Sequence, residues 1–167
     1  MAGDINIKVN LKELEAFIKR YPEASLFARR SRISEATLLL QREIMLKTPE
    51  GGGPIHLRDT IFSTISIGEP VWGMVGTPAI YGAAVEYGTK PHPVSKIGQE
   101  AILFWVTKKL GLSGKEAKSA AFCIARAIKK RGTKGAHMFE KGFALSETRV
   151  IAMLKQIPED IVRAVNA

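Results

Sequence analysis

The sequence predicts an α+β fold with a small antiparallel β-sheet and several helices packed mainly on one face of that sheet. Two short runs rich in β-branched and aromatic residues, at 61–67 and 71–75, flank the turn residues Gly68-Glu69-Pro70, a pattern typical of a hairpin. Most of the remaining chain repeats apolar residues every three or four positions, as amphipathic helices do. With 167 residues, 46% of them apolar and 25% charged, the chain suits a single soluble domain spanning residues 1–167.

The first 47 residues predict one strand and two helices. Residues 4–10 alternate apolar and polar side chains, which is typical of a half-exposed strand. Residues 11–21 have helical spacing, and a longer helix is expected over 22–47. Its first residue, Pro22, suits a first helical turn, and Thr48-Pro49 followed by three glycines should end it.

Residues 75–92 predict the element around which the rest of the chain is organised. A short helix of small residues follows Pro78 and carries one carboxylate, Glu86. Gly88 suits a left-handed cap, and Pro91 prevents the helix from resuming. We therefore expect a folded hub that projects a basic, proline-containing loop.

Three more helical regions are expected after this hub. A helix over 99–110 ends at a glycine, a capping box at 113–116 opens the next helix, and Gly132 ends that helix. The last segment, 138–165, should be divided or kinked at Pro158. Small residues predominate on the apolar stripe of the middle helix, so another helix should pack closely against it. That stripe comprises Ala117, Ala120, Ala121, Ile124, Ala125 and Ile128.

The net charge of +9 is concentrated in one segment. Residues 108–142 contain ten basic and two acidic side chains and carry +8, whereas 1–50 carry +2, 51–107 carry −1 and 143–167 are neutral. A local excess of this kind suits a polyanion or an acidic protein face, although a solvated helix face is its commonest explanation. No aromatic side chains are interleaved with the basic run at 129–131, so base stacking is not indicated.

No catalytic or metal-binding pattern is found. Residues 111–116 lack the spacing of a phosphate-binding loop. The three histidines, His56, His92 and His137, lack the spacing of metal ligands. Cys123 is the single cysteine and is expected to be a buried small residue on a helix. We expect no enzyme activity and no cofactor.

Glu86 is the one carboxylate of the hub, and two roles are open to it. It could act as a general base, but holding a loop or pairing with Arg58 fits its surroundings better.

The sequence also contains no apolar run close to 18 residues, and its first residues lack a basic and an apolar region, so neither a transmembrane helix nor a secretory signal is expected.

One short pattern occurs twice. Gly-Thr-Lys at 88–90 and again at 132–134 each follows a predicted helix and is followed within a few residues by a histidine. The two copies could mark an internal repeat, or they could be two glycine-ended helices that lead into basic loops. We favour the second interpretation, because two short matches do not make a repeat fold.

Three segments resemble a known family in the same order. Residues 81–89, Tyr-Gly-Ala-Ala-Val-Glu-Tyr-Gly-Thr, resemble its Tyr-Ala-x-x-Val-Glu-aromatic-Gly-Thr signature. Thr48-Pro49 with Leu-Arg-Asp-Thr-Ile at 57–61 resembles an earlier segment, and 128–133 with 137–139 resembles a later one. The family comprises small tail components of long-tailed (siphovirus-type, lambda-like) bacteriophages, the head–tail joining or tail-completion proteins of the neck. This chain departs from the family pattern in a longer first loop, 51–54, and in the absence of the usual proline before Phe139.

The resemblance implies a structural, non-enzymatic protein of a phage or prophage tail or head–tail junction. Such a protein would assemble as a homo-oligomeric ring with other neck and tail proteins, in the host bacterial cytoplasm and then in the virion. Non-specific contact with DNA is an open possibility, whereas a membrane or a small-molecule substrate is not expected. The alternative function is that of a small basic DNA-binding protein. Subunit or partner contacts are expected in loops 48–58, 88–98 and 132–138. The candidate interface residues are Arg58, Glu86, Lys90, His92, Lys129, Lys130, Arg131, Lys134 and His137.

Overall fold

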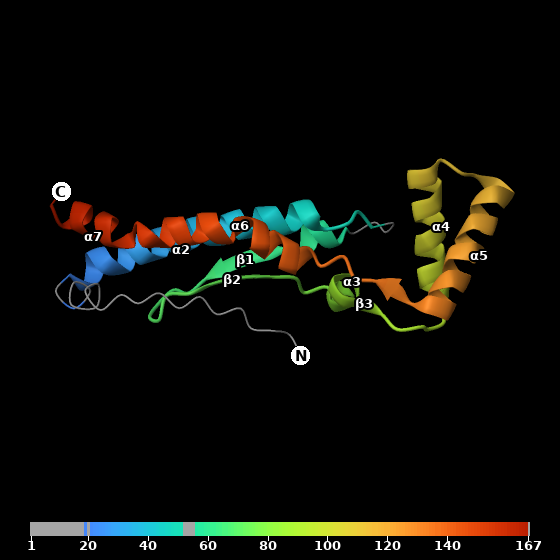
Figure 1. Ribbon diagram of the computed structural model, residues 1–167, viewed down its shortest axis with the longest axis horizontal. Helices are drawn as coiled ribbons and strands as arrows, with labels where there is room; N and C mark the ends of the chain where they lie inside the picture. The colour runs from blue at the N-terminus through green and yellow to red at the C-terminus, as the bar shows by residue number, and fades with distance from the viewer. Residues whose placement is uncertain (1–18, 20, 52–55, 167) are drawn as a thin grey trace.

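The computed structural model describes residues 19, 21–51 and 56–166. It confirms an α+β fold, with two two-stranded antiparallel sheets among mostly helical elements. Figure 1 shows an elongated molecule, with a long helical body at one end and an antiparallel pair of helices at the other. The strand expected over 4–10 lies outside the described residues, as does nearly all of the helix expected over 11–21.

The body is built on one long helix. Helix α2 (Pro22–Lys47) begins with proline in its first turn and has the predicted bounds. Helix α6 (Met138–Lys155) packs along it, and α7 (Ile157–Val165) follows after a short break. Pro158 lies in the first turn of α7, so the predicted division of this segment is confirmed.

Small residues allow α2 and α6 to lie very close together. Met138, Gly142, Ser146 and Val150 follow one another at intervals of four and are all buried. A Cβ atom added at Gly142 would lie only 2.8 Å from the backbone nitrogen of Ile44. The backbones of the two helices are therefore in direct contact at this crossing.

The predicted hairpin is present and lies against α2. Strands β1 (Phe62–Ile65) and β2 (Gly73–Gly76) pair antiparallel, with Phe62 opposite Gly76 and Ile65 opposite Gly73. Helix α2 contacts both strands and covers one face of this sheet. The expectation of helices on one face of the sheet is met by the helical body, whereas α4 and α5 lie at the other end of the molecule (Figure 1).

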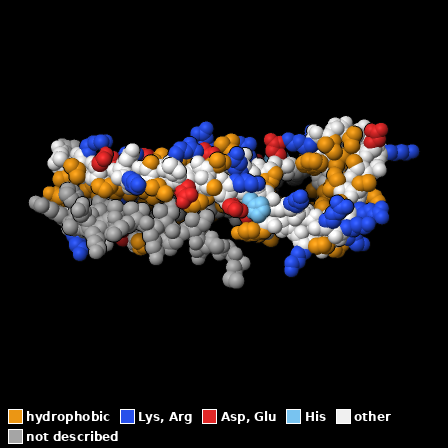
Figure 2. All heavy atoms as spheres, in the orientation of Figure 1, with side chains coloured by type: hydrophobic (Ala, Val, Ile, Leu, Met, Phe, Trp, Pro, Cys, Tyr) orange, Lys and Arg blue, Asp and Glu red, His pale blue; other side chains and the backbone are white. Residues whose placement is uncertain are grey.

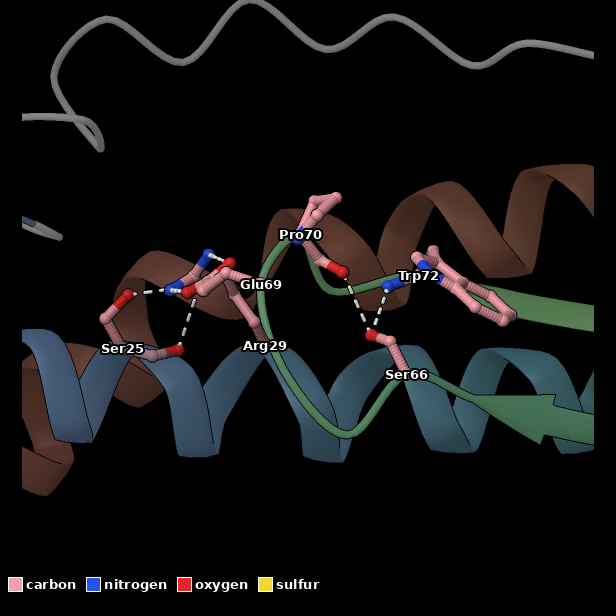
Figure 3. Close-up of polar contacts among 6 residues, drawn as sticks. All are labelled: Ser25, Arg29, Ser66, Glu69, Pro70 and Trp72. Atoms are coloured by element: carbon pink, nitrogen blue, oxygen red, sulfur yellow. Dashed lines mark hydrogen bonds and ion pairs between the residues drawn. The ribbon is translucent and has the colours of Figure 1, made fainter.

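Polar contacts hold the turn of the hairpin in place (Figure 3). Two guanidinium nitrogens of Arg29 on α2 donate hydrogen bonds to the carboxylate of Glu69, and Nη1 lies 3.0 Å from Glu69 Oε2. The Ser66 hydroxyl donates to the carbonyl of Pro70 at 3.0 Å and accepts from the amide of Trp72 at 3.0 Å. The turn is thus tied both to itself and to the helix beneath it.

A short helix and a second, smaller sheet lead away from the body. Helix α3 (Gly82–Tyr87) runs directly into β3 (Gly88–Thr89), which pairs antiparallel with β4 (Thr133–Lys134). Gly88 has the positive φ expected of a cap, at 78°, but its ψ of −175° lies outside the left-handed helical region. This combination of φ and ψ is accessible essentially only to glycine.

Helices α4 (Lys96–Leu110) and α5 (Gly114–Arg131) form a helical hairpin beyond this sheet. Helix α4 begins earlier than expected, because the Ser95 side chain accepts the Gly98 amide at 3.1 Å and caps the first turn. Gly111 ends α4 with φ 66° and ψ 12°, as expected of a left-handed cap. The capping box expected at 113–116 is wrong, since the Ser113 side chain makes no cap hydrogen bond.

Within the described part of the chain, the buried apolar residues form three clusters. Ala28 and Ile161 belong to a cluster between α2 and α7, and Ile44 and Met138 to a cluster between α2 and α6. The third cluster lies inside the helical hairpin, where Val106 packs against Ala117 and Ala121. The predicted close packing of a helix on the alanine stripe is confirmed, whereas the assignment of residues 1–167 to one domain stays a prediction.

Candidate interaction site

The two Gly-Thr-Lys segments pair with each other. Gly88 lies opposite Lys134, and Thr89 lies opposite Thr133, with their hydroxyl oxygens 3.0 Å apart. Each copy does follow a helix, as the favoured interpretation expected, because α3 ends at Gly88 and α5 ends at Gly132. We call residues 88–90 and 132–134 the ribbon, since together they connect the helical hairpin to the body (Figure 1).

Backbone hydrogen bonds extend this pairing into the body. The amide of Ala136 donates to the carbonyl of Val85 at 2.7 Å, and the amide of His137 donates to the carbonyl of Glu86 at 3.1 Å. His137 itself has φ 53° and ψ 45°, which is uncommon for a residue other than glycine. Its Nδ1 lies 2.9 Å from Oε2 of Glu140.

Glu86 holds the start of α6. Its side chain is buried, and its two carboxylate oxygens accept the amides of Phe139 at 3.0 Å and Glu140 at 3.3 Å. A carboxylate is favourable there, because the first amides of a helix lack partners within the helix and carry its positive dipole end. Glu86 therefore does hold a neighbouring segment in place, and that segment is the first turn of α6. Both of its carboxylate oxygens accept backbone amides of α6 rather than pairing with Arg58.

Parts of all three segments that carry the family resemblance meet in the body, whereas 128–133 lie at the end of α5 and in β4. Leu57 and Ile61, from the first segment, share a buried cluster with Met138 of the third. Val85, from the central segment, packs on the edge of the same cluster, while Glu86 caps the helix that Met138 begins. The resemblance therefore falls on residues that contact one another, although up to 81 positions separate them in the sequence.

The basic residues of the prediction lie at the other end of the molecule. Lys129, Lys130 and Arg131 are exposed in the last turn of α5, where positive charge is favourable for a helix terminus. Lys134 is exposed on β4, and Lys90 is exposed just after β3. Figure 2 shows lysine and arginine side chains gathered over this end.

His92 lies in the same region, and its side chain is hydrogen-bonded within its own loop. The side chain is exposed, and its Nδ1 lies 2.9 Å from the carbonyl oxygen of Lys90. Arg58 lies elsewhere, in the 3₁₀ helix η1 (Leu57–Thr60), where it lines a hollow with Trp105 and Lys108. The structure thus brings the basic candidates of 90–134 together and leaves Arg58 apart from them.

The basic end of α5 borders an apolar groove that the sequence did not reveal. Pro93 and Val94 form one wall, and Phe122 of α5 forms another. Arg126, Lys129 and Lys130 supply the charged rim, and the hollow has a volume of about 570 Å³. We call these six residues the docking groove. One signal was available, because Phe122, Arg126 and Lys129 fall at i, i+4 and i+7 and therefore share a helix face.

One expectation about a side chain is corrected on α5. Cys123 lies on this helix as expected, but it is exposed rather than buried. The residues of α5 in the cluster with α4 are Ala117, Ala120, Ala121 and Ile124, and Cys123 is not among them. Phe122 lines the same groove as Lys129, but it precedes the basic run by seven positions and is not interleaved with it.

No family model, curated protein or solved structure matches this chain. Among residues 19, 21–51 and 56–166, no three His, Cys, Asp or Glu side chains lie close enough together to hold a metal ion. None of the helices in the described part of the chain combines the length and apolarity that crossing a bilayer requires.

Proposed function

We propose that this protein is a structural component of a bacteriophage or prophage tail and that it acts at the head–tail junction by assembly. The observation that carries the proposal is the meeting of the three family-like segments. Leu57 and Ile61 share a buried cluster on whose edge Val85 and Phe139 pack, and Glu86 accepts the amide of Phe139. Residues of a family signature that contact one another in this way describe a shared fold better than a chance similarity of sequence would.

The shape of the molecule supports assembly into a ring. The body and the helical hairpin lie at opposite ends, so each subunit offers two different surfaces (Figure 1). A ring requires heterologous contacts, in which one patch of a subunit meets a different patch of the next. Exposed apolar side chains occur at both ends, among them Phe27 on α2 and Phe122 on α5, which are 72% and 66% exposed.

DNA binding is the second candidate, and the charge of residues 108–142 favours it. Ten basic and two acidic side chains fall in that segment, and much of the excess lies on one end of the molecule. A protein that uses these side chains on phosphates would bind duplex DNA with an affinity that falls steeply with salt. Tight, sequence-specific duplex binding would favour this candidate over the tail-structural one.

A complementation experiment tests the proposal. The coding sequence is deleted from the phage or prophage that encodes it, and the intact chain is supplied from a plasmid. We expect the deletion to yield separate heads and tails in electron micrographs, and the plasmid to restore joined, infective particles. Native mass measurement of the chain with the neighbouring neck proteins should then show a closed oligomer. Normal particles from the deletion strain would refute the proposal.

A further inference from the structure

Among the residues that the structure describes, none covers one face of the helical hairpin. Its own buried core consists of Val106, Ala117 and Ala121, all on the faces that α4 and α5 turn toward each other. Phe122 remains outside that core and is 66% exposed, and it lines one hollow with the apolar residues Pro93 and Val94. Apolar surface of this kind, rimmed by polar residues, marks an interaction site.

Most of the charges beside this face are positive and favour an acidic partner. Arg126, Lys129 and Lys130 line the rim of the docking groove, and Lys96 and Lys118 line the adjoining hollow with one acidic residue, Glu100. Within the part of the chain that the structure describes, none of the three rim residues forms an ion pair. Their positive charges are therefore free to meet carboxylates from another molecule.

The wall of the groove is held in place before any partner arrives. The carbonyl of Val94 accepts the side-chain amide of Gln99 at 3.1 Å, and Ser95 caps the first turn of α4. Just before the wall, the ring of His92 is hydrogen-bonded to the carbonyl of Lys90. Binding of a partner would therefore cost little free energy for ordering this loop, and such preorganisation increases affinity.

We propose that the docking groove binds an acidic, amphipathic segment of another protein. One large apolar side chain of that segment would lie between Phe122 and the wall at Pro93 and Val94, while flanking carboxylates would meet Lys129 and Lys130. This inference rests on the proposed function, in which a neighbouring neck or tail protein supplies the segment.

A nucleic acid fits the groove less well. Phosphates have no apolar group to bury between Phe122 and the wall at Pro93 and Val94, and non-specific duplex binding needs only positive charge. Single strands are held by stacking successive bases on several aromatic rings, whereas among the described residues only one aromatic side chain, Phe122, lines this groove. DNA binding is therefore an outcome for the test to detect.

The test uses two double variants with the same change in net charge. Lys129→Gln with Lys130→Gln removes charge from the groove, while Lys115→Gln with Lys155→Gln removes it from exposed positions that do not line the groove. A third variant, Phe122→Ser, removes the aromatic wall. The full-length proteins are titrated into a labelled helical peptide rich in glutamate and leucine, into a peptide of equal charge with serine in place of leucine, and into a DNA duplex.

We expect the amphipathic peptide to bind the parent more tightly than the serine peptide does. The groove double variant should lose about tenfold in affinity, which corresponds to about 1.4 kcal/mol for two exposed charge contacts. The control double variant should lose less than about twofold in affinity. That small loss reflects the long-range effect of charge, which salt largely screens. Phe122→Ser should abolish the preference for leucine over serine. Circular dichroism melts verify that each exposed substitution leaves the fold intact.

Several results would overturn the inference. Equal losses in the two double variants would mean that net charge alone drives binding. Tighter binding of the duplex than of the peptide, or no peptide binding by the parent at low salt, would exclude an acidic protein segment as the occupant. The complementation assay separates the two proposals. If the parent restores joining and the groove variants do so equally well, the groove inference fails and the proposed function stands. If the parent does not restore joining, the proposed function fails.

Discussion

Replacing Gly88 with alanine should separate the two strands of the ribbon. A Cβ atom at this position would lie against the carbonyl oxygen of Thr133 and 2.7 Å from the backbone nitrogen of Gly135. Gly132 is in the mirrored situation, since its Cβ would lie against the carbonyl oxygen of Thr89. Both obstacles are backbone atoms, so a side-chain rotation cannot relieve them.

The expected cost is the sum of two terms. Residues other than glycine at φ near 78° with an extended ψ cost about 1–3 kcal/mol. Separating β3 from β4 also loses backbone hydrogen bonds, each worth about 1 kcal/mol. Alanine returns up to about 1 kcal/mol by restricting the unfolded chain. Gly88→Ala should therefore lower the free energy of unfolding by about 2–4 kcal/mol.

Gly111 provides the matched control. It too has a positive φ, at 66°, but no atom lies within 4 Å of the position that its Cβ would take. Gly111→Ala should therefore show the conformational cost alone, about 1–2 kcal/mol for a left-handed residue. Urea unfolding followed by circular dichroism measures all three substitutions. Equal losses for Gly88→Ala and Gly111→Ala would refute the close contact across the ribbon.

The double variant gives a second, independent measurement. Either substitution alone should already separate the same two strands, so Gly88→Ala combined with Gly132→Ala should cost clearly less than the sum of the single variants. Strictly additive losses would show that the two glycines act separately and that the ribbon is not one unit.

Three further substitutions test other parts of the structure. Gly142→Ala should lower the thermal midpoint through an overpacking cost of about 1–3 kcal/mol against the backbone of α2, despite the better helix propensity of alanine, and a raised midpoint would contradict this. The hydrogen bonds from Arg32, at 2.5 and 3.1 Å, hold the pKa of Asp160 below its ordinary value. The contribution of Asp160 to stability is therefore complete above about pH 4 and is lost as the pH falls through the lowered pKa. Asp160→Asn should make the thermal midpoint fall less steeply as the pH is lowered below about 4. An unchanged dependence of the midpoint on pH would exclude the Arg32–Asp160 pair as the cause of that fall. Ala121→Leu should disrupt the contact between α4 and α5 at a cost of about 1–3 kcal/mol, whereas the exposed Ala127→Leu should leave the unfolding midpoint unchanged within error.

Local sequence signals predicted most of the helices and the β1–β2 hairpin. The bounds of α2 follow from Pro22 in its first turn and from Thr48-Pro49 after its end, and Pro158 divides α6 from α7 for the same backbone reason. Local signals were also where errors arose. The motif at 113–116 predicted a capping box, but Gly114 adopts φ 57°, and the Ser113 side chain does not cap the helix.

The candidate site was less accessible to prediction, because it depends on pairs that are distant in sequence. Thr89 meets Thr133 across 44 positions, and the Glu86 carboxylate reaches the amide of Phe139 across 53. The spacing within either segment contains no information about which partner it meets. The docking groove likewise needs Phe122 on α5 and Val94 in a loop to be placed beside each other.

The ribbon also affects how far the length and sequence of the helical hairpin, α4 and α5, can vary. Thr89 and Thr133 are direct partners across the two strands, so the 43 residues between them form an excursion that starts and finishes at one place. An Asn-Gly turn is suited to closing such a pair in a two-residue loop, which would leave the body with a short hairpin in place of α4 and α5. Most residues of the family-like segments lie outside this excursion, but 128–132 lie inside it, and Lys129 and Lys130 of the docking groove belong to that stretch. Replacing this excursion would leave the two buried clusters of the body intact, because neither contains a residue of 90–132, but it would remove the ion pair between Lys109 of α4 and Glu50.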